Sequence, residues 1–439
     1  MLPSAKPNAA AYTTHPVIAL IVASLLAFHG CARIKKVQVQ YGSFPAHPEE
    51  KLERHNFSAA AGEDLVGRLA VIQLEKGDTI PDVARHFGLG TNAVSAANPY
   101  IDIWAPQEGE RLLLPMKFIL PDGPRNGIVI NLPAMRLFYF KNRGKQVSTY
   151  PLGIGTEERP TPMGNMEVVK KVIKPTWYVP ASIAEDHRKK GDILPPQVLP
   201  GPDNPLGDYA LYLSRPSYLI HGTNKPASVG LRATNGCMRL YPENIKKLFD
   251  QTQVGTPVRI VNQPYLAGRS NGVIYLEAHA PLDDLTGDPL EEVYEKLALL
   301  EKKSSAAVDW RKVRNTLAEA AGYPVPVSKS THDADQLSTG IVEVNHPRRL
   351  LGAPVVPELR VGAWYVWVAD KKNELEAVRL AAMVNHQGPP IPARVLPRQN
   401  GYRVLAGPFN SKNEAANAIK QLRFDLEIEG QLIAPGRKK

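Results

Sequence analysis

A histidine and a cysteine lie close together in a stretch rich in glycine and turn-forming residues, between positions 221 and 239. His221 precedes Cys237 by 237 − 221 = 16 positions. A thiol attacks a carbonyl only as its thiolate, and a nearby imidazole can take up its proton. Gly236 lets the backbone approach a substrate closely, and the N–H groups of Gly236 and Cys237 are candidates for stabilising an oxyanion. A cysteine is more often a small buried hydrophobic residue, so the residue types alone leave catalysis and a structural role open.

The same stretch contains three ordered segments: HGT from His221, GLR from Gly230 and TNGCMRL from Thr234. Together they resemble the signature of the YkuD-type L,D-transpeptidases. A T-P-x-G turn at residues 161–164 stands where that family has one, ahead of a strand that borders the active site. The resemblance implies a mainly β catalytic domain, built as a mixed β-sandwich or barrel-like sheet. The sequence shows no cluster of metal ligands and no phosphate-cradling loop, so we expect no cofactor and no metal ion.

The resemblance also implies roles for the residues of the motif. Cys237 is the nucleophile, and His221 is the base and then the acid for the leaving amine. The main-chain carbonyl of Gly222 orients the imidazole. Gly236 contributes backbone support to the oxyanion hole.

Four further residues are candidates for the substrate site. Arg239 matches an arginine that orders the family's site, and it either meets a substrate carboxylate or forms a structural salt bridge. Asn235 stands where many relatives have histidine, so a proton relay at this position is lost. Thr234 matches the family's Ser or Thr, and Thr223 follows the His-Gly pair.

The implied reaction is acyl transfer on peptidoglycan. The thiol attacks the carbonyl of the diamino acid in a tetrapeptide stem, releases D-Ala and leaves a thioester. An amine of another stem then gives a 3→3 cross-link, a lysine of an outer-membrane lipoprotein gives a tethered protein, and water gives carboxypeptidase products. A hydrolytic L,D-carboxypeptidase or amidase and a non-enzymatic wall-binding scaffold stay open as alternatives.

The N-terminus has the pattern of an export signal. Residues 17–28 form an apolar run, with Ser24 as its one polar residue, that is too short for an ordinary membrane span. The sequence HGCA follows and resembles a bacterial lipobox, so we predict a signal peptide over residues 1–31 with Cys31 as the lipidation candidate. Ordinary cleavage or an uncleaved anchor is the alternative. We predict a membrane-anchored protein in the periplasm of a Gram-negative bacterium, with residues 32–67 as a tether.

The net charge of +10 suits an anionic polymer as a neighbour. Charge alone does not choose among nucleic acid, a membrane surface and the cell wall. Export argues against nucleic acid, so we expect the stem peptides and glycan strands of peptidoglycan as partners.

Residues 68–117 predict a small module of strand, helix, helix and strand. A strand is expected at residues 69–74, helices near residues 80–87 and 91–97, and a closing strand at residues 111–115. This order, with the segments GDTI, VAxxFG and ANP, resembles a LysM domain, which implies binding of N-acetylglucosamine-containing glycans. The glycan-binding candidates by position are Gly77, Asp78, Thr79, Ile80 and Asn98. The alternative is a small structural cap on the enzyme.

The rest of the chain divides into four segments. Residues 125–262 are predicted as the catalytic domain, residues 263–322 as a helical extension of it, and residues 323–357 as a proline-rich linker. Residues 358–435 read as β-α-β-β-α, and the segment YRVLAGPF resembles a SPOR domain, which implies binding to peptidoglycan strands stripped of stem peptides. A ferredoxin-like protein-interaction domain is the alternative. The predicted fold class is therefore multidomain α+β.

Overall fold

The computed structural model describes residues 46–47, 52–60, 62–189, 191–282, 288–303, 306–329 and 340–436. The predicted signal peptide, Cys31 and most of the predicted tether lie outside these residues. Within the described ranges, no helix combines the length and the apolar character that crossing a membrane requires.

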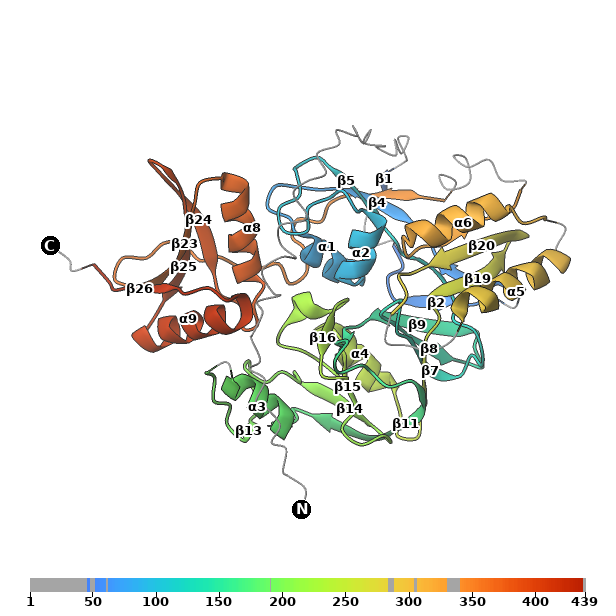
Figure 1. Ribbon diagram of the computed structural model, residues 1–439, viewed down its shortest axis with the longest axis horizontal. Coiled ribbons are helices and arrows are strands. Elements are labelled where there is room, and N and C mark those ends of the chain that lie inside the picture. The colour runs from blue at the N-terminus through green and yellow to red at the C-terminus, as the bar shows by residue number, and fades with distance from the viewer. Residues whose placement is uncertain are drawn as a thin grey trace, which may run out of the picture. The chain divides into compact units, whose positions relative to one another are not determined.

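The catalytic region is organised around a mixed sheet of nine strands (Figure 1). In spatial order these are β17 (Met238–Arg239), β15 (Leu219–His221), β14 (Tyr209–Leu213), β11 (Gly164–Ile173), β18 (Pro257–Val261), β7 (Gly127–Asn131), β8 (Arg136–Lys141), β9 (Gln146–Pro151) and β2 (Asn56–Ser58). The β7–β8–β9 meander is antiparallel, whereas β18 runs parallel to β7 and β17 runs parallel to β15. The mainly β character expected for this region is therefore observed.

Helix α4 (Pro242–Gln251) covers part of this sheet because one of its faces is apolar. Ile245, Leu248 and Phe249 are buried in the same apolar cluster as the strand residues Ile220 and Met238. The helix starts with proline at its first turn, where the missing N–H costs no hydrogen bond. Since β15 and β17 flank the predicted active site, this packing fixes the two strands that carry the site.

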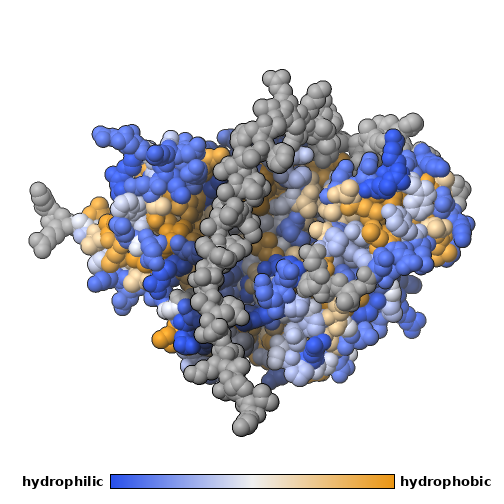
Figure 2. All heavy atoms as spheres, viewed as in Figure 1, coloured by the Kyte–Doolittle hydropathy of each residue, from blue (hydrophilic) through white to orange (hydrophobic). Residues whose placement is uncertain are grey.

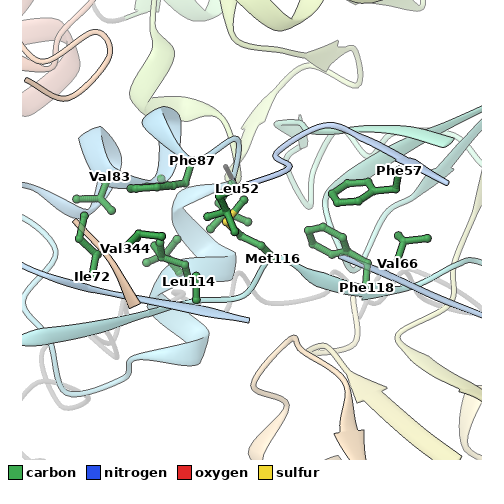
Figure 3. Close-up of a cluster of buried hydrophobic side chains, with 14 of the residues drawn as sticks. Leu52, Phe57, Val66, Ile72, Val83, Phe87, Leu114, Met116, Phe118 and Val344 are labelled. Carbon is green, nitrogen blue, oxygen red and sulfur yellow. The ribbon is translucent and has the colours of Figure 1, made fainter. Parts of the chain in front are cut away.

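The predicted tether is partly ordered structure. Strand β2 (Asn56–Ser58) pairs antiparallel with β9 at the edge of the large sheet, and β3 (Leu65–Gly67) pairs with β6 (Lys117–Ile119). Phe57 and Val66 enter an apolar cluster with Phe118 (Figure 3). The interpretation as a tether was wrong for these residues, because burying a few apolar side chains outweighs the polar composition around them.

The N-terminal module has the expected order of β4 (Ala70–Gln73), α1 (Ile80–His86), α2 (Thr91–Ala97) and β5 (Arg111–Leu114). Strands β4 and β5 pair antiparallel. Thr79 caps α1 by accepting a hydrogen bond from the N–H of Asp82, as Ser and Thr do at this position. The side chains of Ile72, Val83, Phe87 and Leu114 meet in the core (Figure 3).

The predicted proline-rich linker also contributes to this core. Strand β22 (Val342–Val344) lies between β1 (Ala46–His47) and β4, parallel to both. Val344 is buried against the N-terminal module. A second short strand, β21 (Val325–Pro326), pairs with β20 (Val273–Ala278). The linker interpretation was therefore wrong at both places, where alternating valines supply apolar side chains to a sheet.

The extension forms its own small layered unit. Strands β19 (Tyr265–Ser270) and β20 (Val273–Ala278) form a hairpin, and helices α5 (Pro289–Lys302) and α6 (Trp310–Glu319) lie beside it (Figure 1). Val293, Leu297 and Val313 pack against Ile274 and Leu276 in one apolar cluster. The two helices were predicted, and the packing explains their apolar spacing.

The C-terminal module is a four-stranded antiparallel sheet with two helices. The strand order is β24 (Ala393–Arg398), β25 (Gly401–Phe409), β23 (Trp364–Lys371) and β26 (Gln431–Ile433). Helices α8 (Glu374–Asn385) and α9 (Lys412–Leu426) share one apolar cluster with the sheet. Ser411 caps α9 by accepting a hydrogen bond from the N–H of Glu414. Strand β26 was not predicted.

A buried histidine next to this framework predicts acid sensitivity. Burial against Tyr150 lowers the pKa of His55 from 6.5 to about 4, although a hydrogen bond to the carbonyl of Thr149 opposes the shift. Below pH 6.5 the unfolded chain binds a proton that the folded chain does not, so stability falls as the pH drops from about 6.5 to about 4. This group accounts for up to about 3 kcal/mol of that loss.

We expect His55→Gln to remove that part of the acid sensitivity, because glutamine can still donate to Thr149 but does not titrate. Urea unfolding of both proteins at pH 8, 6 and 4.5 measures the difference. An unchanged dependence of the unfolding midpoint on pH would show that His55 is not the responsible group.

Candidate active site

The sheet brings the predicted nucleophile and base to neighbouring strands. His221 is the last residue of β15, and Cys237 directly precedes β17. The two strands pair with Ile220 opposite Met238 and His221 opposite Arg239. Ile220 and Met238 are fully buried, so the core holds the register that puts His221 and Cys237 on the same face of the strand pair, offset by two residues.

His221 is held as a neutral imidazole in one orientation. Its Nδ1 lies 2.6 Å from the carbonyl oxygen of Gly222, and its side chain is almost fully buried. When Nδ1–H donates to that carbonyl, Nε2 is left with a lone pair that can accept a proton. Burial lowers the pKa of His221 to about 3, and the positive charge of Arg239 adds to the effect. At neutral pH the side chain is therefore a free base.

Cys237 rests as a thiol. Burial raises the pKa of its thiol, while a backbone hydrogen bond at Leu219 and the charge of Arg239 act in the opposite direction. The thiol lies 3.5 Å from the carbonyl oxygen of Ser217, to which it donates, and the side chain stays partly exposed. The pair is thus a neutral thiol and a neutral imidazole, and proton transfer to His221 must accompany attack.

The backbone around Cys237 is fixed by the hydroxyl of Thr234. It accepts the N–H of Gly236 at 3.2 Å and donates to the carbonyl of Cys237 at 2.6 Å. The N–H of Gly236 was expected to face the oxyanion but already donates to Thr234, whereas the N–H of Cys237 has no acceptor among the described residues. Gly236 has φ +99°, and a Cβ would lie 2.8 Å from the ring of Tyr218, so only glycine fits there.

Arg239 is a cation without a carboxylate partner among the residues the structure describes. Its Nη1 donates to the hydroxyl of Ser228 at 2.8 Å, and its buried Nε has no hydrogen-bond partner there. Burial lowers the pKa of Arg239 to about 10. The structural salt bridge considered for this arginine is therefore not seen among the described residues, and contact with a substrate carboxylate stays a prediction.

Two residues that the sequence did not assign to the site contact it. Thr161 donates to the carbonyl of Gly236 at 2.9 Å, and Arg159 donates to the side chains of Asn235 and Asp186. Asp186 belongs to helix α3 (Ala181–Lys189), so Arg159 links that helix to the loop of the nucleophile. The T-P-x-G turn was the one sequence signal for this region, but it indicated a turn and not these contacts.

The segment around α3 presents apolar side chains to solvent. Tyr178, Ile193 and Leu199 are 72%, 84% and 64% exposed. They lie between β11 and β14, on the same connection as Asp186. On the visible face of the molecule, hydrophobic residues are likewise exposed in small groups among hydrophilic ones (Figure 2).

Thr223 and Asn235 occupy different positions at the site. Thr223 is buried and its hydroxyl accepts the N–H of Lys225 at 2.9 Å, so its side chain shapes the turn after His221. Asn235 is exposed and holds Arg159. Of the four substrate-site candidates, Thr223 and Thr234 therefore hold the local backbone. Arg239 and Asn235 instead contact the side chains of Ser228 and Arg159.

Most glycan-binding candidates of the N-terminal module have internal roles. Ile80 is buried in the core, and Asn98 donates to two carbonyls and accepts the N–H of Leu113. Thr79 caps α1, and the Asp78 carboxylate lies 3.0 Å from His346. A Cβ on Gly77 would meet no atom within 4 Å, so this turn is open. The side chains of Ile80 and Asn98 are thus engaged within the module, and glycan binding at the five positions stays a prediction.

Comparison with known proteins decides the family. The probable L,D-transpeptidase ErfK/SrfK of Salmonella typhimurium (strain LT2) is 36% identical over 275 residues, which are 61% of this chain and 89% of that protein. The chain belongs to the L,D-transpeptidase family. Residues 125–260 match the L,D-transpeptidase catalytic domain (YkuD), and residues 361–434 match the SPOR domain. The resemblances to the YkuD-type L,D-transpeptidases and to a SPOR domain are confirmed, and the resemblance of residues 68–117 to a LysM domain stays a prediction.

Two relatives from Escherichia coli (strain K12) agree with this L,D-transpeptidase assignment. The probable L,D-transpeptidase YbiS is 40% identical over 225 residues, which are 50% of this chain and 73% of that protein. The probable L,D-transpeptidase YcfS is 35% identical over 277 residues, which are 61% of this chain and 87% of that protein.

Proposed function

We propose that this L,D-transpeptidase acts on tetrapeptide stems of peptidoglycan, with Cys237 as the nucleophile and His221 as the base. The observation that carries the proposal is the pairing of β15 with β17, which places a neutral, oriented imidazole and a partly exposed thiol on adjacent strands. Nucleophilic acyl transfer uses a thiol and a base that lie near each other.

The reaction proceeds in two acyl transfers. The Cys237 proton passes to Nε2 of His221 as sulfur bonds to the carbonyl carbon of the diamino acid. The C–N bond to D-Ala then breaks, and His221 returns the proton to the leaving amine, which leaves a thioester. An acceptor amine attacks the thioester and gives a proton to His221, and the resulting imidazolium protonates the departing sulfur, which restores the neutral imidazole. Each half-reaction conserves atoms and charge and ends with a neutral pair.

Arg239 is suited to bind a carboxylate of the donor stem. A buried guanidinium that hydrogen-bonds only a hydroxyl gains most from an anionic partner, because its charge is otherwise uncompensated. The stem offers carboxylates at its terminal D-Ala and in its other residues. This contact would favour peptides over neutral acyl donors.

The modules on either side are proposed to hold the enzyme on its polymeric substrate. The SPOR domain binds glycan strands, and the LysM-like module, whose β-α-α-β order is present, adds a second wall contact through its open Gly77 turn. We further propose a periplasmic location in a Gram-negative bacterium, anchored through Cys31, with an outer-membrane lipoprotein as one acceptor.

Analysis of products by liquid chromatography and mass spectrometry tests the function. Purified enzyme is incubated with disaccharide-tetrapeptide, with and without a second stem as acceptor. We expect D-Ala release and 3→3 cross-linked dimers. Tripeptide without dimers would point to the hydrolytic alternative, and unchanged substrate with intact binding to sacculi would point to the scaffold.

A further inference from the structure

We infer that Thr161 is a positioning residue that aims the N–H of Cys237 at the oxyanion of the acyl-transfer reaction. The inference rests on the proposed function of Cys237. Thr161 is 2% exposed and lies 75 residues away from Gly236 in sequence, yet its hydroxyl donates to the Gly236 carbonyl at 2.9 Å. Among the described residues, the Thr161 hydroxyl forms hydrogen bonds with the backbone of Gly236 and Gly155, and with neither the thiol nor the imidazole.

The geometry of the peptide bond connects this hydrogen bond to the reaction. The carbonyl of Gly236 and the N–H of Cys237 belong to one planar trans peptide, so they point in opposite directions. A hydrogen bond that fixes the carbonyl therefore fixes the N–H as well. Because Thr161 holds the oxygen on the buried side, the N–H points away from Thr161, and no described residue accepts it.

The hydroxyl of Thr161 is itself constrained. It accepts the N–H of Gly155 at 2.9 Å, so its single proton is committed to Gly236. Gly155 ends strand β10 (Ile154–Gly155) and pairs with Thr234 of β16 (Arg232–Thr234). A Cβ on Gly155 would lie 2.2 Å from the carbonyl oxygen of Arg159, so the turn that presents Thr161 is closely packed.

Two threonines thus hold the backbone around the nucleophile from opposite ends. Thr234 binds the N–H of Gly236 and the carbonyl of Cys237, and Thr161 binds the carbonyl of Gly236. The remaining polar backbone atom of this pair of residues is the N–H of Cys237. A donor held in advance stabilises developing negative charge without reorganising during the reaction.

The size of the effect follows from the loss of one oriented donor. Removing an oxyanion-hole donor costs about 100- to 1,000-fold in rate, and misaiming it costs less. We expect Thr161→Val, which keeps the shape but loses the hydroxyl, to slow acylation of Cys237 about 10- to 100-fold. Thr161→Ser keeps the hydroxyl and should recover most of the rate.

The test compares two reactions of the same thiol in the full chain. Acylation by disaccharide-tetrapeptide and by p-nitrophenyl acetate passes through an oxyanion, whereas alkylation by iodoacetamide attacks a saturated carbon and does not. For Thr161→Val we expect slower acylation by both donors, with unchanged substrate KM, and an alkylation rate within about twofold of the unmodified protein. Thr161→Ser should resemble the unmodified protein in all three reactions.

Several outcomes overturn the inference. Equal acylation rates in Thr161→Val and the unmodified protein would show that the hydrogen bond does not aim the N–H. A parallel fall in acylation and alkylation, or a fall that serine does not rescue, would show a merely structural role. If the unmodified protein reacts with p-nitrophenyl acetate but not with the stem peptide, the proposed substrate is wrong, and the ester alone still decides the role of Thr161.

Discussion

Replacing Cys237 with serine will reduce D-Ala release from tetrapeptide stems by at least about 1,000-fold. His221 is a weak base because its pKa is lowered to about 3. It can assist deprotonation of a thiol as sulfur attacks, but it is poorly matched to a serine hydroxyl, whose proton is far less acidic. Release of D-Ala, measured with a coupled amino-acid oxidase assay, gives the ratio.

A matched control separates lost chemistry from lost folding. Cys237→Ala should be equally inactive but should bind isolated sacculi like the unmodified protein, since the SPOR domain occupies residues 361–434 and lies outside the catalytic sheet. The small alanine side chain leaves the contacts of Thr161 and Thr234 with the backbone unchanged. Residual turnover above about one thousandth in Cys237→Ala would mean that another group is the nucleophile.

Replacing His221 with glutamine will lower kcat/KM by about 100- to 10,000-fold, because the amide can donate to the Gly222 carbonyl but cannot accept a proton at neutral pH. We expect the variant to stay folded and Cys237 to keep its position, so that the loss is one of activity. Circular dichroism and the rate of iodoacetamide alkylation check these two points. A loss below tenfold would remove His221 from the role of base.

The acidic side of the pH–rate profile offers a second test of His221. Because burial lowers its pKa to about 3, the imidazole stays neutral and competent as pH falls from 7 to about 4. We therefore expect kcat/KM to show no histidine titration near pH 6.5, over the range in which circular dichroism shows folded protein. A midpoint near 6.5 that disappears in His221→Gln would contradict the buried, neutral imidazole.

Local sequence patterns predicted the regular elements well. The helix of residues 91–97 follows from the short-range spacing of its residues, which a sequence displays directly. The short strands β2 and β22 were missed for the opposite reason. Each has three residues and pairs with a strand distant in the sequence, so no local sequence pattern predicts it.

The same distinction explains what was predicted of the site. Cys237 and His221 stand in an ordered motif, so their types and spacing were informative. The contacts of Thr161 and Arg159 join segments 75 and 76 residues apart, and only the fold brings these together. The N–H of Gly236 was assigned to the oxyanion hole, but it donates to the hydroxyl of Thr234, two residues earlier. Side-chain hydroxyls often form such local hydrogen bonds with the backbone in turns.

The most direct measurement is the intact mass of the protein after brief mixing with disaccharide-tetrapeptide, with Cys237→Ala alongside. The account predicts an adduct equal to the substrate minus D-Ala, present in the unmodified protein, absent in Cys237→Ala and formed more slowly in Thr161→Val. An adduct that persists in Cys237→Ala, or turnover of the stem without any covalent species under single-turnover conditions, would contradict acyl transfer through this thiol.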